Sequence, residues 1–584
     1  MSADEPEPDE PSGDAEGLDT LRREREEGGE EHHAFWADEV ADRVLERVAD
    51  QREAAEDASG EPASSDLDDP IVVKGGISPS GVPHLGNVNE IMRGYFVAEV
   101  LRERGYDVRQ VFTADDRDPL RKLPRTLCDL DGNLVDLGDV DAGALGRNLG
   151  VPYTDVPDPF GCCDSYGAHF SNIIKDSADA VDVPIDLVST TELYESGELD
   201  EVTRHVLENR DRAREVLAEY QDKVDEDYVP FNPICEDCGK ITETVTGVDL
   251  DAEPPTVEYE CTDMDAGERT IEGCGHEGTA TLREGKLPWR FEWPAQWEVL
   301  GVDFEPFGKD HAEGSWPSGE DVSRNVLGNE PPVPMVYEWF TLDGEPFSSS
   351  EGNVILVSDV LDLLEPEVLR YFFAKDPSKA RDFSIGRLDQ LVDEFDRLEA
   401  VYFDEVAASE DETAFADRVY PLLVDEPGAE RIRLPYTFAA VLGMTDDPEL
   451  REEIARREGH VPDDAPEWAV EGALARVEKA RNWARRTENE FDYELKRSEI
   501  PDHDFDDATA AALDELADFV AEGHGPEEIQ GEIYETAKRH DVDIGAFFGA
   551  GYRLFFDEEQ GPKLGPFLAN VDRNFVVDRL RRER

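Results

Sequence analysis

The stretch "IVVKGGISPSGVPHLGNVNEIMRGYFVAEVLRERGYDVRQVFTADD", residues 71–116, contains the pattern that decides the fold. Residues 71–77 form an apolar run that predicts a buried strand, and a turn rich in Gly, Ser and Pro follows at 78–83. Residues 84–105 have helical periodicity and end on a glycine, and 107–116 predict a second strand. This βαβ order predicts a doubly wound parallel sheet.

The bulk composition limits the class of protein. The chain has 584 residues, which favours three or four domains, and its 140 acidic and 57 basic residues give a formal net charge of −83. Self-repulsion of that size destabilises a compact state in dilute buffer, whereas molar salt shortens the Debye length to about 3 Å. We therefore predict adaptation to a salt-rich cytoplasm. The alternative, a disordered acidic protein, conflicts with Leu, Val, Phe and Trp at core-like spacing.

The N-terminal region has no basic-then-apolar signal, and no run of about 18 apolar residues occurs in the sequence. These features predict a soluble cytoplasmic protein that binds no membrane, and nothing in the sequence indicates a DNA partner. The seven cysteines include one Cys-x-x-Cys pair, which in a reducing compartment favours metal over disulfide.

The turn before the predicted helix has the chemistry of a phosphate site. A strand that enters a helix through such a turn directs free N–H groups and the positive end of the helix dipole at whatever lies above it. His84 and Asn87 add neutral donors, and Gly86 allows a base or ribose to approach the backbone. The alternative is an ordinary strand–turn–helix connection with a capping histidine.

Several segments resemble class I lysyl-tRNA synthetases. "PSGVPHLGN" (79–87) resembles the HIGH motif of class I aminoacyl-tRNA synthetases, with Asn87 in place of the second histidine. "SSSEGN" (348–353) resembles the end of the KMSKS loop in its form K-M-S-S-S-x-G-N. Residues 287–311, 560–580 and 33–44 resemble the lysyl enzymes in particular, and the likeness runs from about residue 32 to the end.

The resemblance implies a two-step reaction. The carboxylate of lysine attacks the α-phosphate of ATP, which enters with Mg²⁺, and the lysyl group then passes to the 3′ end of tRNA(Lys). Activation is expected to require tRNA. The alternatives are a glutamyl, glutaminyl or arginyl enzyme, a nucleotidyltransferase that needs no tRNA, and a non-catalytic RNA-binding relative.

The resemblance also implies site residues. The catalytic set, expected to act as hydrogen-bond donors and not as a general base, is His84, Asn87, Ser348, Ser349 and Ser350. The ATP-binding set is Pro79, Ser80, Gly81, Val82, Pro83, His84, Leu85, Gly86, Asn87, Phe347, Gly352 and Asn353.

For lysine, Gly76, Ser78 and His311 resemble the family's amino-acid contacts, and Trp289 or Trp293 is the preferred wall for the side chain. Trp297 is a further candidate, and each tryptophan alone is more often a core residue than a ligand. The candidates for the carboxylate that meets the ε-ammonium are Glu292 and Asp310.

The serine loop departs from the family pattern. Pro346 and Phe347 stand where lysine and methionine are usual, so the loop lacks its cations. Mg²⁺ and the helix start at His84 are then the expected sources of positive charge. The basic candidates are Lys74, Lys122 and Lys309.

Four cysteines have a spacing that favours a structural Zn²⁺ site. They are Cys235, Cys238, Cys261 and Cys274. The second pair is unusually far apart in the sequence, so His276 is an alternative fourth ligand. A further alternative is that the cysteines are reduced and hold no metal. Cys128, Cys162 and Cys163 are interpreted as packing residues.

The domain organisation combines these features. Aromatic-rich strands and loops are expected at 289–342, and the helices from about 360 onward are expected to contact tRNA. Arg481, Trp483 and Arg485 are candidate RNA contacts, with a solvated helix face as the alternative. The predicted divisions are a disordered extension at 1–31, a helix and linker at 32–70, a Rossmann-type catalytic domain at 71–125 and 285–355, an inserted acceptor-stem and zinc subdomain at 126–284, a connecting helical domain at 356–400, and an anticodon-binding helical domain at 401–584.

Overall fold

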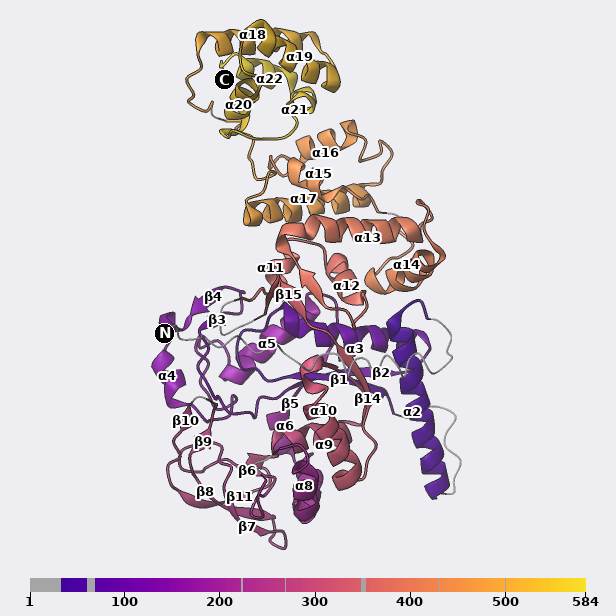
Figure 1. The fold of residues 1–584 in the computed structure, drawn as a ribbon, viewed down its shortest axis with the longest axis vertical. Coiled ribbons are helices and arrows are strands. Elements are labelled where there is room, and N and C mark those ends of the chain that lie inside the picture. The colour runs from indigo at the N-terminus through magenta and orange to yellow at the C-terminus, as the bar shows by residue number, and fades with distance from the viewer. Residues whose placement is uncertain are drawn as a thin grey trace, which may run out of the picture. The chain divides into compact units, whose positions relative to one another are not determined.

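The computed structural model describes residues 33–59, 69–221, 224–267, 269–347, 353–429, 431–498 and 500–583 (Figure 1). The predicted extension at 1–31 and the serine-loop residues Ser348, Ser349, Ser350 and Gly352 lie outside these ranges. The chain divides into two compact units, one of residues 1–358 and 370–383 and the other of 359–369 and 384–584.

The first unit is built on a five-stranded sheet in the order β14-β13-β1-β2-β5. All neighbouring strands are parallel, so the predicted doubly wound sheet is confirmed. Their bounds are β1 Ile71–Ile77, β2 Val108–Ala114, β5 Asp186–Ser189, β13 Val302–Gly308 and β14 Val333–Tyr337. The chain continues from β1 to β2 on one side and returns as β13 on the other, which makes the carboxyl ends of β1 and β13 the switch point where such sheets bind ligands.

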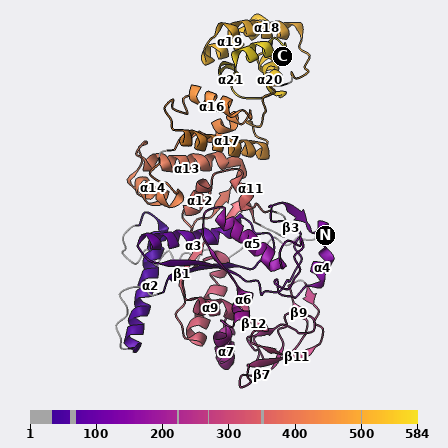
Figure 2. The same ribbon diagram turned by 180° about the vertical axis from the view of Figure 1, so that it is seen from behind.

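Helices cover both faces of this sheet (Figures 1 and 2). Helix α3 (Leu85–Glu103), which is buried over most of its length, and α5 (Tyr166–Asp179) lie on one face. Helices α9 (Trp289–Leu300) and α10 (Ser315–Val322) lie on the other. The chain leaves α3 through Gly105, whose φ of +92° suits glycine.

Two elements differ from the expectation drawn from the sequence. Residues 289–297, expected as strand or loop, belong to α9. The expectation followed the β preference of aromatic residues, but tryptophans spaced four apart lie on one helix face and pack together against the sheet. The sheet also includes β5, which lies in the range predicted as an inserted subdomain, 126–284. The sequence did not predict this strand, because four residues are too few to show a clear pattern.

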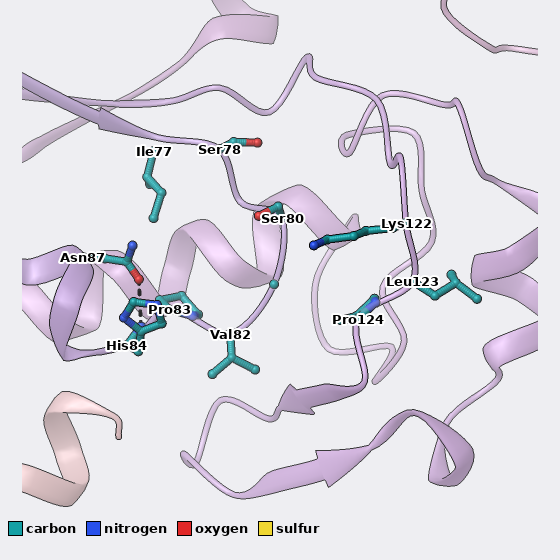
Figure 3. Close-up of a pocket in the computed structure, with 11 residues that line it drawn as sticks. Ile77, Ser78, Ser80, Val82, Pro83, His84, Asn87, Lys122, Leu123 and Pro124 are labelled. Carbon is teal, nitrogen blue, oxygen red and sulfur yellow. Dashed lines mark hydrogen bonds between the residues drawn. The ribbon is translucent and has the colours of Figure 1, made fainter. Parts of the chain in front are cut away.

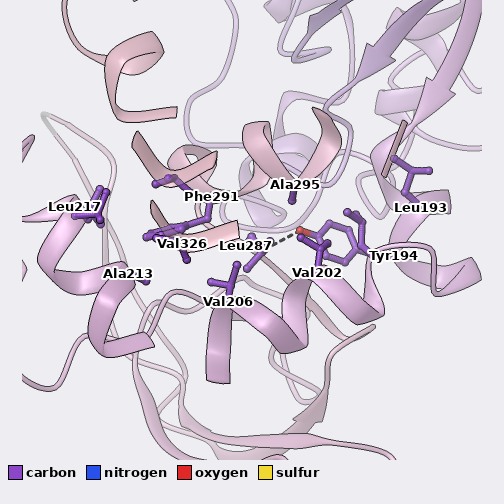
Figure 4. Close-up of a cluster of buried hydrophobic side chains, with 13 residues drawn as sticks. Leu193, Tyr194, Val202, Val206, Ala213, Leu217, Leu287, Phe291, Ala295 and Val326 are labelled. Carbon is purple, nitrogen blue, oxygen red and sulfur yellow. Dashed lines mark hydrogen bonds between the residues drawn. The ribbon is translucent and has the colours of Figure 1, made fainter. Parts of the chain in front are cut away.

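A buried apolar cluster attaches the helices after β5 to α9 within the first unit (Figure 4). Helices α6 (Thr190–Ser196), α7 (Asp200–Glu208) and α8 (Arg210–Leu217) pack their apolar sides against α9 and residues near Val326. The Tyr194 hydroxyl accepts from the Leu287 N–H at 2.8 Å and donates to Glu292 at 2.9 Å, so the buried hydroxyl is satisfied.

The rest of the first unit surrounds this core. An antiparallel sheet of β7, β8 and β11 carries the cysteine group, and the remaining elements are short strands and peripheral helices. Their bounds are α2 Trp36–Ser59, β3 Thr126–Cys128, β4 Leu134–Asp136, α4 Ala142–Arg147, β6 Asn232–Pro233, β7 Val245–Asp249, β8 Thr256–Glu260, β9 Met264–Asp265, β10 Thr270–Ile271, β11 Glu277–Thr281, β12 Gly285–Lys286, β15 Phe340–Leu342, β16 Glu345–Pro346 and β17 Arg381–Phe383.

The second unit is helical. Arg476 joins its parts from a buried position, donating to Glu365 and to Asp396 at 2.6 Å each. Within the described ranges, no helix is both long and apolar enough to cross a membrane. From α11 on, the helices are α11 Val357–Leu361, α12 Pro366–Ala374, α13 Leu388–Tyr402, α14 Glu410–Leu423, α15 Tyr436–Leu442, α16 Pro448–Arg457, α17 Glu467–Thr487, α18 Asp507–Glu522, α19 Pro526–Arg539, α20 Ile544–Phe556, α21 Leu564–Asn570 and α22 Arg573–Leu580.

Candidate active site and metal centres

His84 caps the N-terminus of α3 and keeps one donor free. Its Nδ1 accepts from the Gly86 N–H at 3.1 Å, while the Asn87 Oδ1 accepts from the His84 N–H at 2.9 Å. Burial lowers the pKa of His84 to about 4, so the ring is neutral and its proton is on Nε2. Capping and phosphate binding are therefore compatible, because the Nε2–H and the Asn87 amide N–H groups remain available as donors.

A cavity of about 470 Å³, here called the turn cavity, opens at this helix start (Figure 3). It is lined by Ile77, Ser78, Ser80, Gly81, Val82, Pro83, His84, Asn87, Lys122, Leu123 and Pro124. None of the described residues that line it is acidic, and the ammonium of Lys122 points inward. An anion at this position would meet hydroxyls, the helix dipole and one cation.

A second cavity, of about 460 Å³, adjoins the first and is here called the acidic cavity. The two share Ile77, His84 and Asn87. The acidic cavity lies at the carboxyl ends of β1, β13 and β14 and is lined by three acids, Glu90, Asp310 and Glu338. A cation therefore suits the acidic cavity, and an anion suits the turn cavity.

Glu90 is a site residue that the sequence analysis missed. Its Oε1 accepts from the Gly76 N–H at 2.7 Å and its Oε2 accepts from the Tyr337 hydroxyl at 3.1 Å. Burial raises the pKa of Glu90 to about 8, so a bound ammonium would restore its charged form. The only signal in the sequence is an acid within a helix that is otherwise mostly apolar.

The residues predicted to bind lysine divide into two groups. Gly76, His311 and Asp310 line the acidic cavity, and Ser78 lines the turn cavity. Trp289 and Trp293 stack on each other with ring centroids 4.9 Å apart and lie beside His311, and their role as a wall for lysine stays a prediction.

Glu292, a sequence candidate for the carboxylate that binds the ε-ammonium, has a partner within the chain. It is fully buried and accepts from Lys286 at 2.7 Å. That pairing and its burial leave Glu90, Asp310 and Glu338 as the carboxylates at the cavity, and Glu338 already pairs with Lys309 at 3.2 Å.

The predicted ATP residues surround the helix start. Of these, Ser80, Gly81, Val82, Pro83, His84 and Asn87 line the turn cavity, Gly86 and Phe347 line the acidic cavity, and Pro79 and Leu85 are buried behind them. The Phe347 ring stacks on His84 with centroids 5.0 Å apart, and Asn353 donates to the Pro346 carbonyl at 2.7 Å. The described residues that flank the serine loop are thus joined to each other and reach the helix start.

The four predicted cysteine ligands come together. Their sulfurs lie within 4.8 Å of one another, with Cys235 to Cys274 and Cys238 to Cys261 both at 3.6 Å. Tetrahedral zinc with Zn–S bonds of about 2.3 Å needs sulfurs about 3.8 Å apart, so the geometry fits. His276 instead has its Nε2 2.9 Å from Glu236, so Cys274 completes the set.

A second group that could hold a metal consists of Asp158, Cys162, Cys163 and His169. The interpretation of Cys162 and Cys163 as packing residues is wrong: the Cys162 sulfur is 3.4 Å from His169 Nδ1, which is 3.3 Å from Asp158. The His169 Nε2 contacts the carbonyl of Cys128 at 2.9 Å, the orientation usual for a metal-bound histidine. The segment "DPFGCCDSYGAH" gave the signal, but without the paired spacing of a zinc knuckle.

The expected RNA contacts in α17 are only partly accessible. Trp483 is buried and donates from Nε1 to the Ile385 carbonyl at 2.8 Å, so its assignment to RNA is wrong. Arg481 is paired with Asp446, and Arg485 is exposed.

Comparison with known proteins establishes the family. A model of the family described as tRNA synthetases class I (K) matches residues 34–424. The chain belongs to this family. The resemblance inferred from the HIGH-like and KMSKS-like segments is thereby confirmed.

Relatives of this class I synthetase match along nearly its whole length. It is 73% identical to a protein named lysine--tRNA ligase from Halobacterium salinarum, over 94% of this chain and 97% of the relative. A lysine--tRNA ligase from Haloarcula marismortui is 69% identical over 94% of this chain and 97% of the relative. One from Pyrococcus horikoshii is 33% identical over 94% of this chain and 99% of the relative. As a member of the family, the synthetase uses ATP with Mg²⁺, and its cysteine group could hold a metal.

Proposed function

We propose that this chain is a lysine--tRNA ligase that activates lysine with ATP and transfers it to the 3′ end of tRNA(Lys). The observation that carries the proposal is the pair of adjoining cavities with opposite character, joined at His84 and Asn87. An acid-lined cavity suits the ammonium groups of lysine, and the acid-free one suits the phosphates of ATP. The relatives named lysine--tRNA ligase support the same substrate.

Lysine is held by carboxylates in the acidic cavity. The ε-ammonium pairs with Glu90, which Tyr337 and the Gly76 N–H hold in place. This arrangement orients the lysine carboxylate toward the shared wall at His84. Positioning of this kind supplies much of the rate in a reaction that needs no covalent enzyme intermediate.

The chain's donors act on the phosphates. The lysine carboxylate oxygen attacks the α-phosphorus, the bond to the β-phosphate oxygen breaks, and pyrophosphate leaves with the electron pair. His84 Nε2, the Asn87 amide and the serine hydroxyls at 348–350 donate to the charge that develops, and no general base is needed. Mg²⁺ arrives with ATP, as is usual for phosphate-bound magnesium.

The finer assignments follow from the same proposal. The four-cysteine group holds structural Zn²⁺, because four thiolates at these distances form a closed tetrahedral site. The helical second unit binds the anticodon region of tRNA, and the enzyme works in the cytoplasm.

The test is aminoacylation at high KCl with ATP, total tRNA and each labelled amino acid in turn. Lysine alone should become attached to tRNA. Attachment of glutamate, glutamine or arginine would replace the proposal with another class I specificity. Attachment of none, with tRNA still bound, would favour a non-catalytic RNA-binding relative.

A further inference from the structure

The ammonium of Lys122 has surroundings unlike those of the other two lysines near the active site. Lys74 is buried and pairs with Glu305 at 2.7 Å, and Lys309 pairs with Glu338 at 3.2 Å. Lys122 projects into the turn cavity, and no carboxylate in the described part of the chain lies within ion-pair distance of it. Its positive charge is therefore available to a ligand.

The wall of the turn cavity favours an anion. Acids make up 140 of the 584 residues, yet none of the described residues that line this cavity is acidic, whereas three acids line its neighbour. The start of α3 adds the positive end of a 19-residue helix and the Nε2–H of His84. Figure 3 shows Lys122 reaching into the cavity near Ser80, from a loop separate from the turn that carries His84. An anion in the cavity would thus have donors on two sides.

The chain also lacks the usual alternative source of charge. The serine loop has Pro346 and Phe347 where the family pattern places lysine and methionine. The Phe347 ring stacks on His84, so this position supplies an apolar cover and no cation. A replacement cation has to come from another segment.

We propose that Lys122 is a catalytic residue that binds the β- and γ-phosphates of ATP and stabilises pyrophosphate as it leaves. This inference rests on the proposed function and deepens it. As the bond between the α-phosphorus and the bridging oxygen breaks, the ammonium contacts the oxygens that take up the negative charge. Lys122 loses no proton, and direct contact keeps the interaction effective at molar salt, where the Debye length is about 3 Å.

The experiment compares Lys122→Ala, Lys122→Arg and the unmodified protein at high KCl. Lys175→Ala is the control: it removes the same charge from the surface of α5, where Lys175 pairs with Asp179 at 2.6 Å. The readouts are ATP–pyrophosphate exchange in the presence of tRNA, KM for lysine and for tRNA, and calorimetric binding of magnesium pyrophosphate.

Lys122→Ala should lower kcat for exchange about 100-fold, the usual effect of removing one donor to developing charge. It should weaken pyrophosphate binding at least about tenfold, because one hydrogen bond to a charged group contributes that much to affinity. KM for lysine should stay unchanged. Lys122→Arg should recover most of both, and Lys175→Ala should alter neither.

Three outcomes would overturn the proposal: exchange within about threefold of normal in Lys122→Ala, an equal loss in Lys175→Ala, or unchanged pyrophosphate binding with a raised KM for tRNA alone. The last would place the acceptor end of tRNA at this lysine. If the unmodified protein attaches no lysine to tRNA, the proposed function fails, and pyrophosphate binding still decides the role of Lys122.

Discussion

Replacement of Glu90 by glutamine tests how the acidic cavity recognises lysine. Glutamine has nearly the same shape and can still accept from the Gly76 N–H, so the change removes the charge and little else. Leaving a buried ammonium without its carboxylate costs about 3 kcal/mol, which is about 150-fold in affinity. This is the loss expected when Glu90 is fully ionised.

The size of the loss should depend on pH, because burial raises the pKa of Glu90 to about 8 in the free protein. At pH 7 the carboxyl must release a proton to pair with the ammonium, which costs about 1.4 kcal/mol. The net advantage of Glu90 over glutamine then falls to about 1.6 kcal/mol, or about 15-fold. Affinity for lysine should rise about fivefold between pH 7 and 8 in the unmodified protein and about twofold more above pH 8 before it levels off, whereas Glu90→Gln should lack this rise.

The assay is equilibrium binding of labelled lysine from pH 6.5 to 8.5 at constant high KCl, with thermal melts to verify folding. Titration of free lysine affects both proteins equally and cancels in their ratio. Tyr337→Phe is the matched variant, because it removes one donor to Glu90 and should weaken binding only about three- to tenfold. A Glu90→Gln ratio that stays constant with pH, or a loss below about threefold at pH 8.5, would refute the reasoning.

Three further predictions concern salt, metal and the serine loop. Lowering KCl from molar to about 50 mM should abolish charging and unfold the chain by circular dichroism, because repulsion within a chain of charge −83 is no longer screened; full activity there would contradict the halophilic adaptation. Metal analysis should find zinc, with one ion fewer in Cys238→Ser than in the unmodified protein; unchanged zinc in that variant would contradict the zinc assignment. Alanine at 348–350 should reduce pyrophosphate exchange by about 100-fold while tRNA binding persists, and no reduction would mean that these hydroxyls do not contact ATP.

Local sequence patterns were sufficient to predict the centre of the sheet. Strand, turn and helix at 71–105 each had their own signal, and the parallel pairing of β1 with β2 follows from the helix between them. Helix α9 was misread because aromatic residues were taken as a strand signal, although tryptophans four apart define one helix face. The strand β5 was missed because it is defined by its pairing with β2 in the folded protein, and its four residues have no strand pattern of their own.

The site residues that belong to a local sequence motif could be predicted. Those that meet only because folding brings distant segments together could not. His84 and Asn87 follow from the turn and the resemblance, and the structure adds that the pair caps α3. Glu90 is held at the cavity by the Gly76 N–H of β1 and by Tyr337 of β14, which lies 247 residues along the chain. The group around His169 gave only an indistinct signal, since a loop without paired cysteine spacing brings Asp158 and two adjacent cysteines onto one histidine.

The distribution of charge around His84 indicates which ligands bind there more specifically than the net charge of the chain does. A salt-adapted chain gains solubility from acids anywhere on its surface, so uniform acidity would explain the total of −83 but not an acid-free cavity beside an acid-lined one. At molar salt, charges farther apart than about 3 Å are largely screened, so general surface acidity neither repels ATP nor attracts lysine. Recognition then depends on direct contacts. In the proposed arrangement, Glu90 supplies these contacts to lysine on one side of the shared wall, and the donors of the turn cavity supply them to ATP on the other.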